Sequence, residues 1–263
     1  MSALRPGGKG AALLALLALA AGAVVARAEP VRHGDVQVSF SAKIAPKRLP
    51  RDGLAAISAT VGGRVIGLGG KPPPQLRSIA IATNSHAHFD LAGLPGCDLR
   101  RIQPATTSQA LRACGDAKVG EGSFAANVII PTQSPFPSRG KLVAFNGREG
   151  GHPVIFAHVF GTDPIPTSYT LSLRLRPSHG TYGTVLEASL PKVTAKVAYI
   201  TEISLTLGRR YRAGRRRHSY LSAGCPAPAG FSATAFPLAR TSFGFAGGLT
   251  LSSVLTRSCR VRG

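Results

Sequence analysis

Apolar and polar residues alternate with a period of two in segment after segment of this chain. Every second position from Val36 to Ile44 is apolar, and Val119 to Ile130 alternates in the same way. This period places one apolar face on a β-strand. Further strands are expected at 54–68, 76–83, 141–145, 154–160, 169–175, 182–190, 197–207, 218–222, 232–236, 241–245 and 249–257. Turn-forming residues separate these segments at near-regular spacing, which predicts an all-β protein built as a β-sandwich.

One stretch of the chain favours a helix. Thr106, Thr107 and Ser108 are residue types that accept hydrogen bonds from the free N–H groups of a first helical turn. The segment from Gln109 to Cys114 contains neither glycine nor proline, and Gly115 follows where a helix commonly ends. We therefore predict one short helix within the β-sandwich.

Two turn-rich segments bear on the domain organisation. Asn146-Gly147 begins a run that ends at Gly151, and Asn-Gly favours a tight hairpin turn. The segment 161–167, which contains Asp163-Pro164, is the best candidate for a boundary between two lobes. Residues 29–263 are thus expected to form a β-sandwich region, either undivided or with two lobes meeting near 161–167.

The N-terminus has the composition of a secretory signal peptide. Arg5 and Lys9 precede an apolar run from Ala11 to Val25, and Ala26-Arg27-Ala28 has the small-x-small pattern of a cleavage site. The apolar run is too short to be read as a membrane span. We expect residues 1–28 to be removed and the mature chain to be secreted or held at the cell envelope, without a transmembrane segment.

The four cysteines follow from this expected export. An even number of cysteines in an exported chain indicates disulfides, and four cysteines allow three connectivities. A bridge between Cys97 and Cys114 would close a short loop and pin the predicted helix. A bridge between Cys225 and Cys259 would tie together the last strands. We predict these two pairs.

Several short motifs are similar to those of a known family. They are Gly-Leu-Pro-Gly-Cys97, Ala110-Leu-Arg-Ala-Cys114, Gly120-Glu-Gly122, Ala144-Phe-Asn-Gly147, Gly161-Thr-Asp-Pro164, Tyr220-Leu-Ser-Ala-Gly-Cys-Pro226 and Arg257-Ser-Cys-Arg260. With them the chain resembles a family of exported proteins from high-GC bacteria that has no assigned activity. The resemblance covers most of the mature chain. It implies export and a β-rich fold, and it supplies no catalytic residue.

One constellation raises the alternative of an enzyme. His86-Ala-His88-Phe-Asp90 follows an expected strand and is similar to the zinc motif of the metallo-β-lactamase superfamily. Two histidines two positions apart can reach the same zinc ion. However, Leu91 stands where that motif has a further histidine, and the alternating helices of that fold are missing. The alternative is a zinc-dependent hydrolase, whereas our leading expectation includes no metal and no cofactor.

The most basic stretch of the chain lies between two expected strands. It contains Arg209, Arg210, Arg212, Arg215, Arg216 and Arg217, with Tyr211 among them. The whole chain has 32 basic and 11 acidic residues, so carboxylates are too few to pair these arginines in a core. We predict an exposed turn. Because guanidinium groups suit phosphate and carboxylate, this turn could hold an anionic wall polymer or another polyanion. Alternatively, it could serve only as a solvated turn that increases the solubility of the protein.

These observations lead to one functional expectation. The chain is expected to be an exported, non-enzymatic structural or binding protein of the cell envelope that contacts anionic polymers through the arginine-rich turn.

Overall fold

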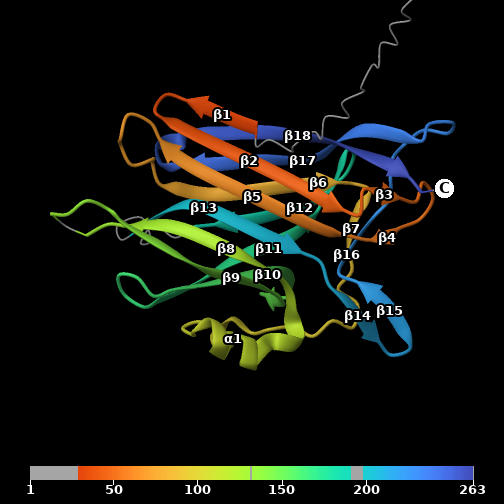
Figure 1. Ribbon diagram of the computed structural model, residues 1–263. Helices are drawn as coiled ribbons and strands as arrows, with labels where there is room; N and C mark the ends of the chain where they lie inside the picture. Colours follow the sequence, from red (N-terminus) through yellow and green to blue (C-terminus); the bar gives the residue numbers. More distant parts are fainter. Residues whose placement is uncertain (1–28, 131, 191–197, 263) are drawn as a thin grey trace, which may run out of the picture.

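A computed structural model describes residues 29–130, 132–190 and 198–262. The expected signal peptide lies outside the described residues. Strands make up most of the described chain (Figure 1). Its strands are β1 (Glu29–His33), β2 (Val36–Ala45), β3 (Arg48–Leu49), β4 (Ala55–Ala56), β5 (Ser58–Gly67), β6 (Leu76–Asn84), β7 (Ala87–Phe89), β8 (Lys118–Val128), β9 (Phe136–Glu149), β10 (His152–Gly161), β11 (Thr167–Pro177), β12 (Tyr182–Ser189), β13 (Ala198–Leu207), β14 (Arg210–Ala213), β15 (Arg216–Ser219), β16 (Leu221–Ala223), β17 (Ala233–Phe245) and β18 (Thr250–Val261). The α-helix is α1 (Thr107–Cys114).

Most strands belong to one large curled sheet. Its order is β1-β2-β5-β13-β8-β9-β10-β11-β12-β6-β17-β18-β3, and neighbouring strands are antiparallel except for β18 and β3. The sheet curls until its ends meet, so that β1 lies beside β18 (Figure 1). The curl brings the two halves of the sheet face to face, as the layers of a sandwich are. The prediction of an all-β sandwich with one short helix is confirmed.

The inward face of the curled sheet carries the core. Val36, Val38 and Phe40 alternate along β2 and pack against residues of β17 and β18. The Phe40 and Phe243 rings have centroids 6.4 Å apart, although β2 and β17 lie far apart in the strand order. A second cluster consists mainly of inward-facing residues of β8 to β13 and includes the fully buried Tyr220. The period-two pattern of the sequence therefore corresponds directly to the buried face.

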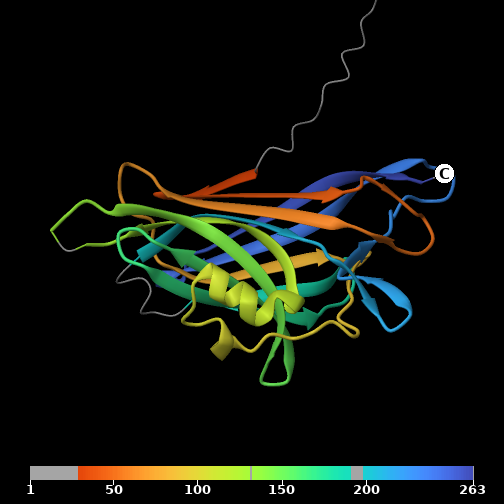
Figure 2. The same ribbon diagram turned by 60° about the horizontal axis from the view of Figure 1, so that its bottom comes forward.

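A separate layer covers the outer face of β9 and β10. The segment 97–117, with α1 inside it, packs on Val143 and Phe145 of β9 and on Val154 and Phe156 of β10 (Figures 1 and 2). These two strands are therefore buried on both faces. Thr106 accepts a hydrogen bond from the Gln109 amide and the Gln109 side chain accepts one from the Thr106 amide, which satisfies two otherwise free donors of the helix start.

Both predicted disulfides are confirmed. Cys97 and Cys114 are bonded and close the covering segment over β9 and β10. Cys225, in the segment after β16, is bonded to Cys259 on β18. All four cysteines are buried, and no free cysteine occurs in the described part of the chain.

One expectation about a turn changes with the structure. The hairpin between β9 and β10 turns at Gly150 and Gly151, which have positive φ, and not at Asn146-Gly147. Gly147 instead pairs with Val154, and a Cβ added there would lie 2.3 Å from the Phe156 ring. Its lack of a side chain thus serves close packing. The segment 161–167 connects β10 and β11, which are neighbours in the large sheet and pair from Val154↔Arg174 to Gly161↔Thr167.

The remaining strands form two small sheets at one end of the molecule. β4, β16 and β7 make a three-stranded sheet, and β14 and β15 make a separate two-stranded one. The segments expected as separate strands at 232–236 and 241–245 are a single strand, β17, with an irregularity at Pro237. Within the described ranges, no helix is long and apolar enough to cross a membrane.

Candidate anion-binding hairpin

The arginine-rich segment forms a hairpin of its own. β14 and β15 pair with each other and with no other described strand, and only Gly214 and Arg215 lie between the last paired residues. Gly214 has φ +60°, the left-handed conformation that such a two-residue turn requires. We call residues 210–219 the arginine hairpin. It projects from the large sheet at lower right in Figure 1. The predicted exposed turn is therefore a short two-stranded ribbon.

Cross-strand pairing sorts the arginines between the two faces of the ribbon. Arg212 pairs with Arg217, and Arg210 pairs with Ser219, so three arginines occupy one face. All three are exposed. Among the described residues none of the three guanidinium groups has a hydrogen-bond or ion-pair partner. Like charges directly opposite each other destabilise a strand pair, so the pairing of Arg212 with Arg217 lowers the stability of the ribbon.

The opposite face fastens the ribbon to the body of the protein. The rings of Tyr211 and His218 stack, with centroids 5.3 Å apart and an interplanar angle of 20°. Tyr211 Oη lies 3.1 Å from the carbonyl oxygen of Asp90 and 3.0 Å from that of Ala92. His218 Nδ1 lies 2.7 Å from Asp90 Oδ2. The ribbon is therefore positioned by two side chains that alternate with the outward arginines.

Asp90 is the fixed point of this contact. Its Oδ1 accepts a hydrogen bond from the Ala92 amide at 2.9 Å, while Oδ2 faces His218. Partial burial acts to raise the pKa of Asp90, but the hydrogen bonds from His218 and Ala92 outweigh it and lower that pKa. Burial and the neighbouring Asp90 carboxylate raise the pKa of Tyr211. At neutral pH a carboxylate and a neutral phenol thus hold the ribbon.

Arg209 has a different role from the other five arginines. Its Nη1 donates hydrogen bonds to the carbonyl oxygens of Asp116 and Lys118, at 2.7 and 2.9 Å. This contact ties the chain entering the ribbon to the segment that follows α1. Arg215 lies in the turn and Arg216 pairs with Ala213 on the fastening face, and both are exposed. The six predicted residues therefore divide into one structural tie and five exposed cations.

The residues of the zinc alternative do not come together. His86 Nδ1 lies 3.1 Å from the Asn84 side-chain oxygen, His88 is exposed on β7, and Asp90 is occupied by His218. No group of three or more potential metal ligands occurs in the described ranges. The structure thus gives the zinc-hydrolase alternative no support. The partnership of Asp90 with His218, 128 residues away, had no signal in the sequence.

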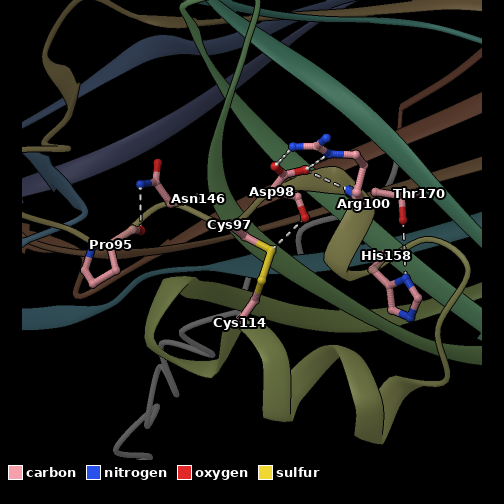
Figure 3. Close-up of a disulfide and its surroundings, with 8 residues drawn as sticks. All are labelled: Pro95, Cys97, Asp98, Arg100, Cys114, Asn146, His158 and Thr170. Atoms are coloured by element: carbon pink, nitrogen blue, oxygen red, sulfur yellow. Dashed lines mark hydrogen bonds and ion pairs between the residues drawn. A yellow bond between two sulfur atoms is a disulfide. The ribbon is translucent and has the colours of Figure 1, made fainter.

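A further histidine lies beneath the segment 97–117 (Figure 3). His158 on β10 is fully buried, and its Nδ1 lies 3.3 Å from Thr170 Oγ1. Its Nε2 has no hydrogen-bond partner among the described residues. Burial lowers the pKa of His158, because the charged form loses its hydration. Nearby, the Asn146 amide donates to the carbonyl oxygen of Pro95 at 3.0 Å, which fixes the start of the covering segment.

Comparisons of the chain with protein-family models, with curated proteins and with solved structures found no significant match.

Proposed function

We propose that this is an exported, non-enzymatic binding protein of the cell envelope that holds anionic polymers on the outward face of the arginine hairpin. The observation that carries the proposal is the pairing of Arg212 with Arg217, beside Arg210, on one exposed face. This arrangement costs stability in the absence of a ligand, and a row of phosphates or carboxylates would reverse that cost.

The fastening of the ribbon supports this proposal. A purely solubilising tip needs no fixed orientation, whereas the stacked Tyr211 and His218 hold the ribbon against Asp90. Guanidinium groups on a fixed ribbon lose less conformational freedom on binding than groups on a loose loop. The signal-peptide pattern and the two disulfides are consistent with a protein that works outside the cytoplasm.

Salt-dependent binding of a polyanion tests the proposal. The probe is a double-stranded DNA oligonucleotide, used as a polyanion of regular charge spacing, titrated against the mature protein at several salt concentrations. Replacing Arg210, Arg212 and Arg217 with serine is expected to reduce the slope of log K against log salt by about 3, because each phosphate contact contributes about 0.9. The melting temperature is expected to stay the same or to rise slightly.

A charge-matched variant serves as the control. Arg101, Arg112 and Arg262 are exposed arginines outside the hairpin, and their triple replacement with serine removes the same net charge. The control should retain nearly the wild-type slope. Equal losses in the two triple variants would mean that the overall charge binds the polymer, and the hairpin would then have no special role.

A further inference from the structure

A groove crosses the outer face of the large sheet, away from the arginine hairpin. Its volume is about 510 Å³, within the range of about 300–1,000 Å³ that is usual for ligand sites. Residues of β5, β8 and β13, the loop after β5 and the start of β9 line it. In Figure 1 the β8–β9 tip lies at the opposite end of the molecule from β14 and β15.

One row of side chains runs across four adjacent strands in this groove. Arg64 on β5 pairs with Glu202 on β13, Glu202 pairs with Ala125 on β8, and Ala125 pairs with Arg139 on β9. Arg64 Nη2 donates to Glu202 Oε2 at 2.7 Å. Ala125 has the smallest side chain of the row, so the surface dips between the ion pair and Arg139.

Arg139 provides the charge that remains in the row. It is exposed and, in the part of the chain that the structure describes, its side chain has no hydrogen-bond or ion-pair partner. Arg64 and Glu202 neutralise each other, and their side chains are 56% and 48% exposed. The row thus offers one uncompensated guanidinium on one side of the dip and a solvent-reachable pair of donor and acceptor on the other.

A β-bulge completes the groove with an aromatic ring. The register between β13 and β8 shifts between Ile200 and Glu202. Tyr199 and Glu202 are three residues apart, yet they pair with Asn127 and Ala125, which are two apart and share one face. Without the bulge Tyr199 would face the opposite side of the sheet. Bulges of this kind re-aim a side chain and are common next to functional sites.

The aromatic ring is held in place. The Asn127 amide donates to Tyr199 Oη at 2.9 Å, which fixes the ring on the floor of the groove. A fixed tyrosine presents an apolar face and a polar rim at little cost in conformational entropy. Asn127 keeps its side-chain oxygen as an acceptor.

The proline-rich segment after β5 forms one wall of the groove. Lys71 and Pro72 approach the strand so closely that a Cβ on Gly67 would lie 1.9 Å from the Lys71 carbonyl oxygen. Lys71 Nζ also lies 3.6 Å from Asp35 Oδ2. Consecutive prolines are stiff, so this wall exists before any ligand arrives.

These contacts restrict the class of ligand. All four strands are paired on both sides, so no free backbone edge is available to an extended peptide. Single-stranded nucleic acid usually stacks on several aromatic rings, and among the described residues Tyr199 is the only aromatic one that lines the groove. The groove presents the ring face of Tyr199, the Asn127 amide, the Arg64–Glu202 ion pair and the unpaired Arg139 side chain. This set matches a sugar ring that carries several hydroxyl groups and one acid group. We infer that the groove binds a saccharide chain that carries carboxylate groups.

The test uses tetragalacturonate as probe, titrated calorimetrically into the mature protein at about 0.15 M salt, where surface charges are screened beyond about 8 Å. Arg139→Gln is expected to weaken binding at least tenfold. Arg112→Gln removes the same charge from α1 and should change the affinity less than twofold. The methyl ester of the probe lacks the carboxylates, so it should bind at least tenfold more weakly to wild type and should not distinguish wild type from Arg139→Gln.

A second variant tests the shape of the groove. Ala125→Leu fills the dip on a solvent-facing strand position, and it should abolish binding of tetragalacturonate while the melting temperature stays within a few degrees. Absence of binding at millimolar concentration would overturn the inference. Unchanged affinity for tetragalacturonate in Arg139→Gln would also overturn it. So would a loss of tetragalacturonate binding in the triple variant of Arg210, Arg212 and Arg217 when Arg139→Gln still binds as wild type does. The last result would leave the proposed role of the hairpin standing, whereas binding that survives in the hairpin triple variant supports the groove as a separate site.

Discussion

At the scale of single residues, Asp90 connects the arginine hairpin to the body of the protein. Its carboxylate accepts hydrogen bonds from His218 of β15 and from the amide of Ala92. Removal of one partner of a charged hydrogen bond usually costs more than the bond itself contributes, because the other partner stays partly buried. Asp90 therefore determines whether the ribbon keeps its orientation.

Replacement of Asp90 with asparagine should destabilise the protein in a pH-dependent way. The folded-state pKa of Asp90 is lowered below its ordinary value of about 3.9. The ionised carboxylate thus stabilises the fold above about pH 4, and this contribution is lost as the pH falls through the folded-state pKa. At pH 7 the free energy of unfolding should drop by about 1 kcal/mol. The difference from wild type should shrink below pH 4 in urea titrations.

The exposed Asp52, which has no hydrogen bond or ion pair among the described residues, provides the control for this experiment. Asp52→Asn should leave the free energy of unfolding nearly unchanged both at pH 7 and below pH 4. A constant difference between Asp90→Asn and wild type from pH 7 down to pH 2 would show that the carboxylate charge is not what holds the ribbon.

At the scale of elements, the segment 97–117 seals a histidine against β10. His158 is fully buried under this layer, and its Nε2 has no partner among the described residues. The neutral imidazole is tolerated there, whereas the imidazolium would require hydration that the layer excludes. The layer and the protonation of His158 are therefore coupled.

Acidification should weaken the fold through His158. Its folded-state pKa is lowered, so the unfolded chain binds the proton more tightly, and stability falls as the pH drops below the unfolded value of about 6.5. Between pH 6.5 and 5 the loss attributable to this group should be at most about 1.4 kcal/mol per pH unit. His158→Leu should remove this slope in urea titrations. The exposed His33, replaced by glutamine, should keep it.

Local patterns predicted the elements, whereas contacts between distant residues could not be read from them. Period-two alternation placed β2 and β8, and the threonine cap placed α1. Asn146-Gly147 misled because the glycine serves the packing of Phe156 and not a turn. The bulge that re-aims Tyr199 depends on the register between β13 and β8, which no single segment contains.

At the scale of the whole molecule, the curl of the sheet depends on contacts between strands that are not hydrogen-bonded to each other. Phe40 on β2 and Phe243 on β17 meet in the core at 6.4 Å between ring centroids, with an interplanar angle of 59°. Both are buried. Because the backbone ladder between β2 and β17 passes through many other strands, side-chain packing of this kind is what holds the two halves together.

A double-mutant cycle on this pair measures how strongly the two halves are coupled. Each single replacement by alanine should lower the free energy of unfolding by about 3–5 kcal/mol, the usual cost of removing a buried phenylalanine. The double variant should lose less than the sum of the two, with a coupling energy of about 0.5–1.5 kcal/mol for the tilted ring pair. Phe156, buried on the outer side of β10 in a different cluster, provides the comparison. Phe40→Ala and Phe156→Ala should be additive within about 0.5 kcal/mol. If the losses of unfolding free energy in Phe40→Ala and Phe243→Ala were also additive, the two faces of the sandwich would not be energetically coupled through this ring pair. The backbone ladder alone would then hold the curl.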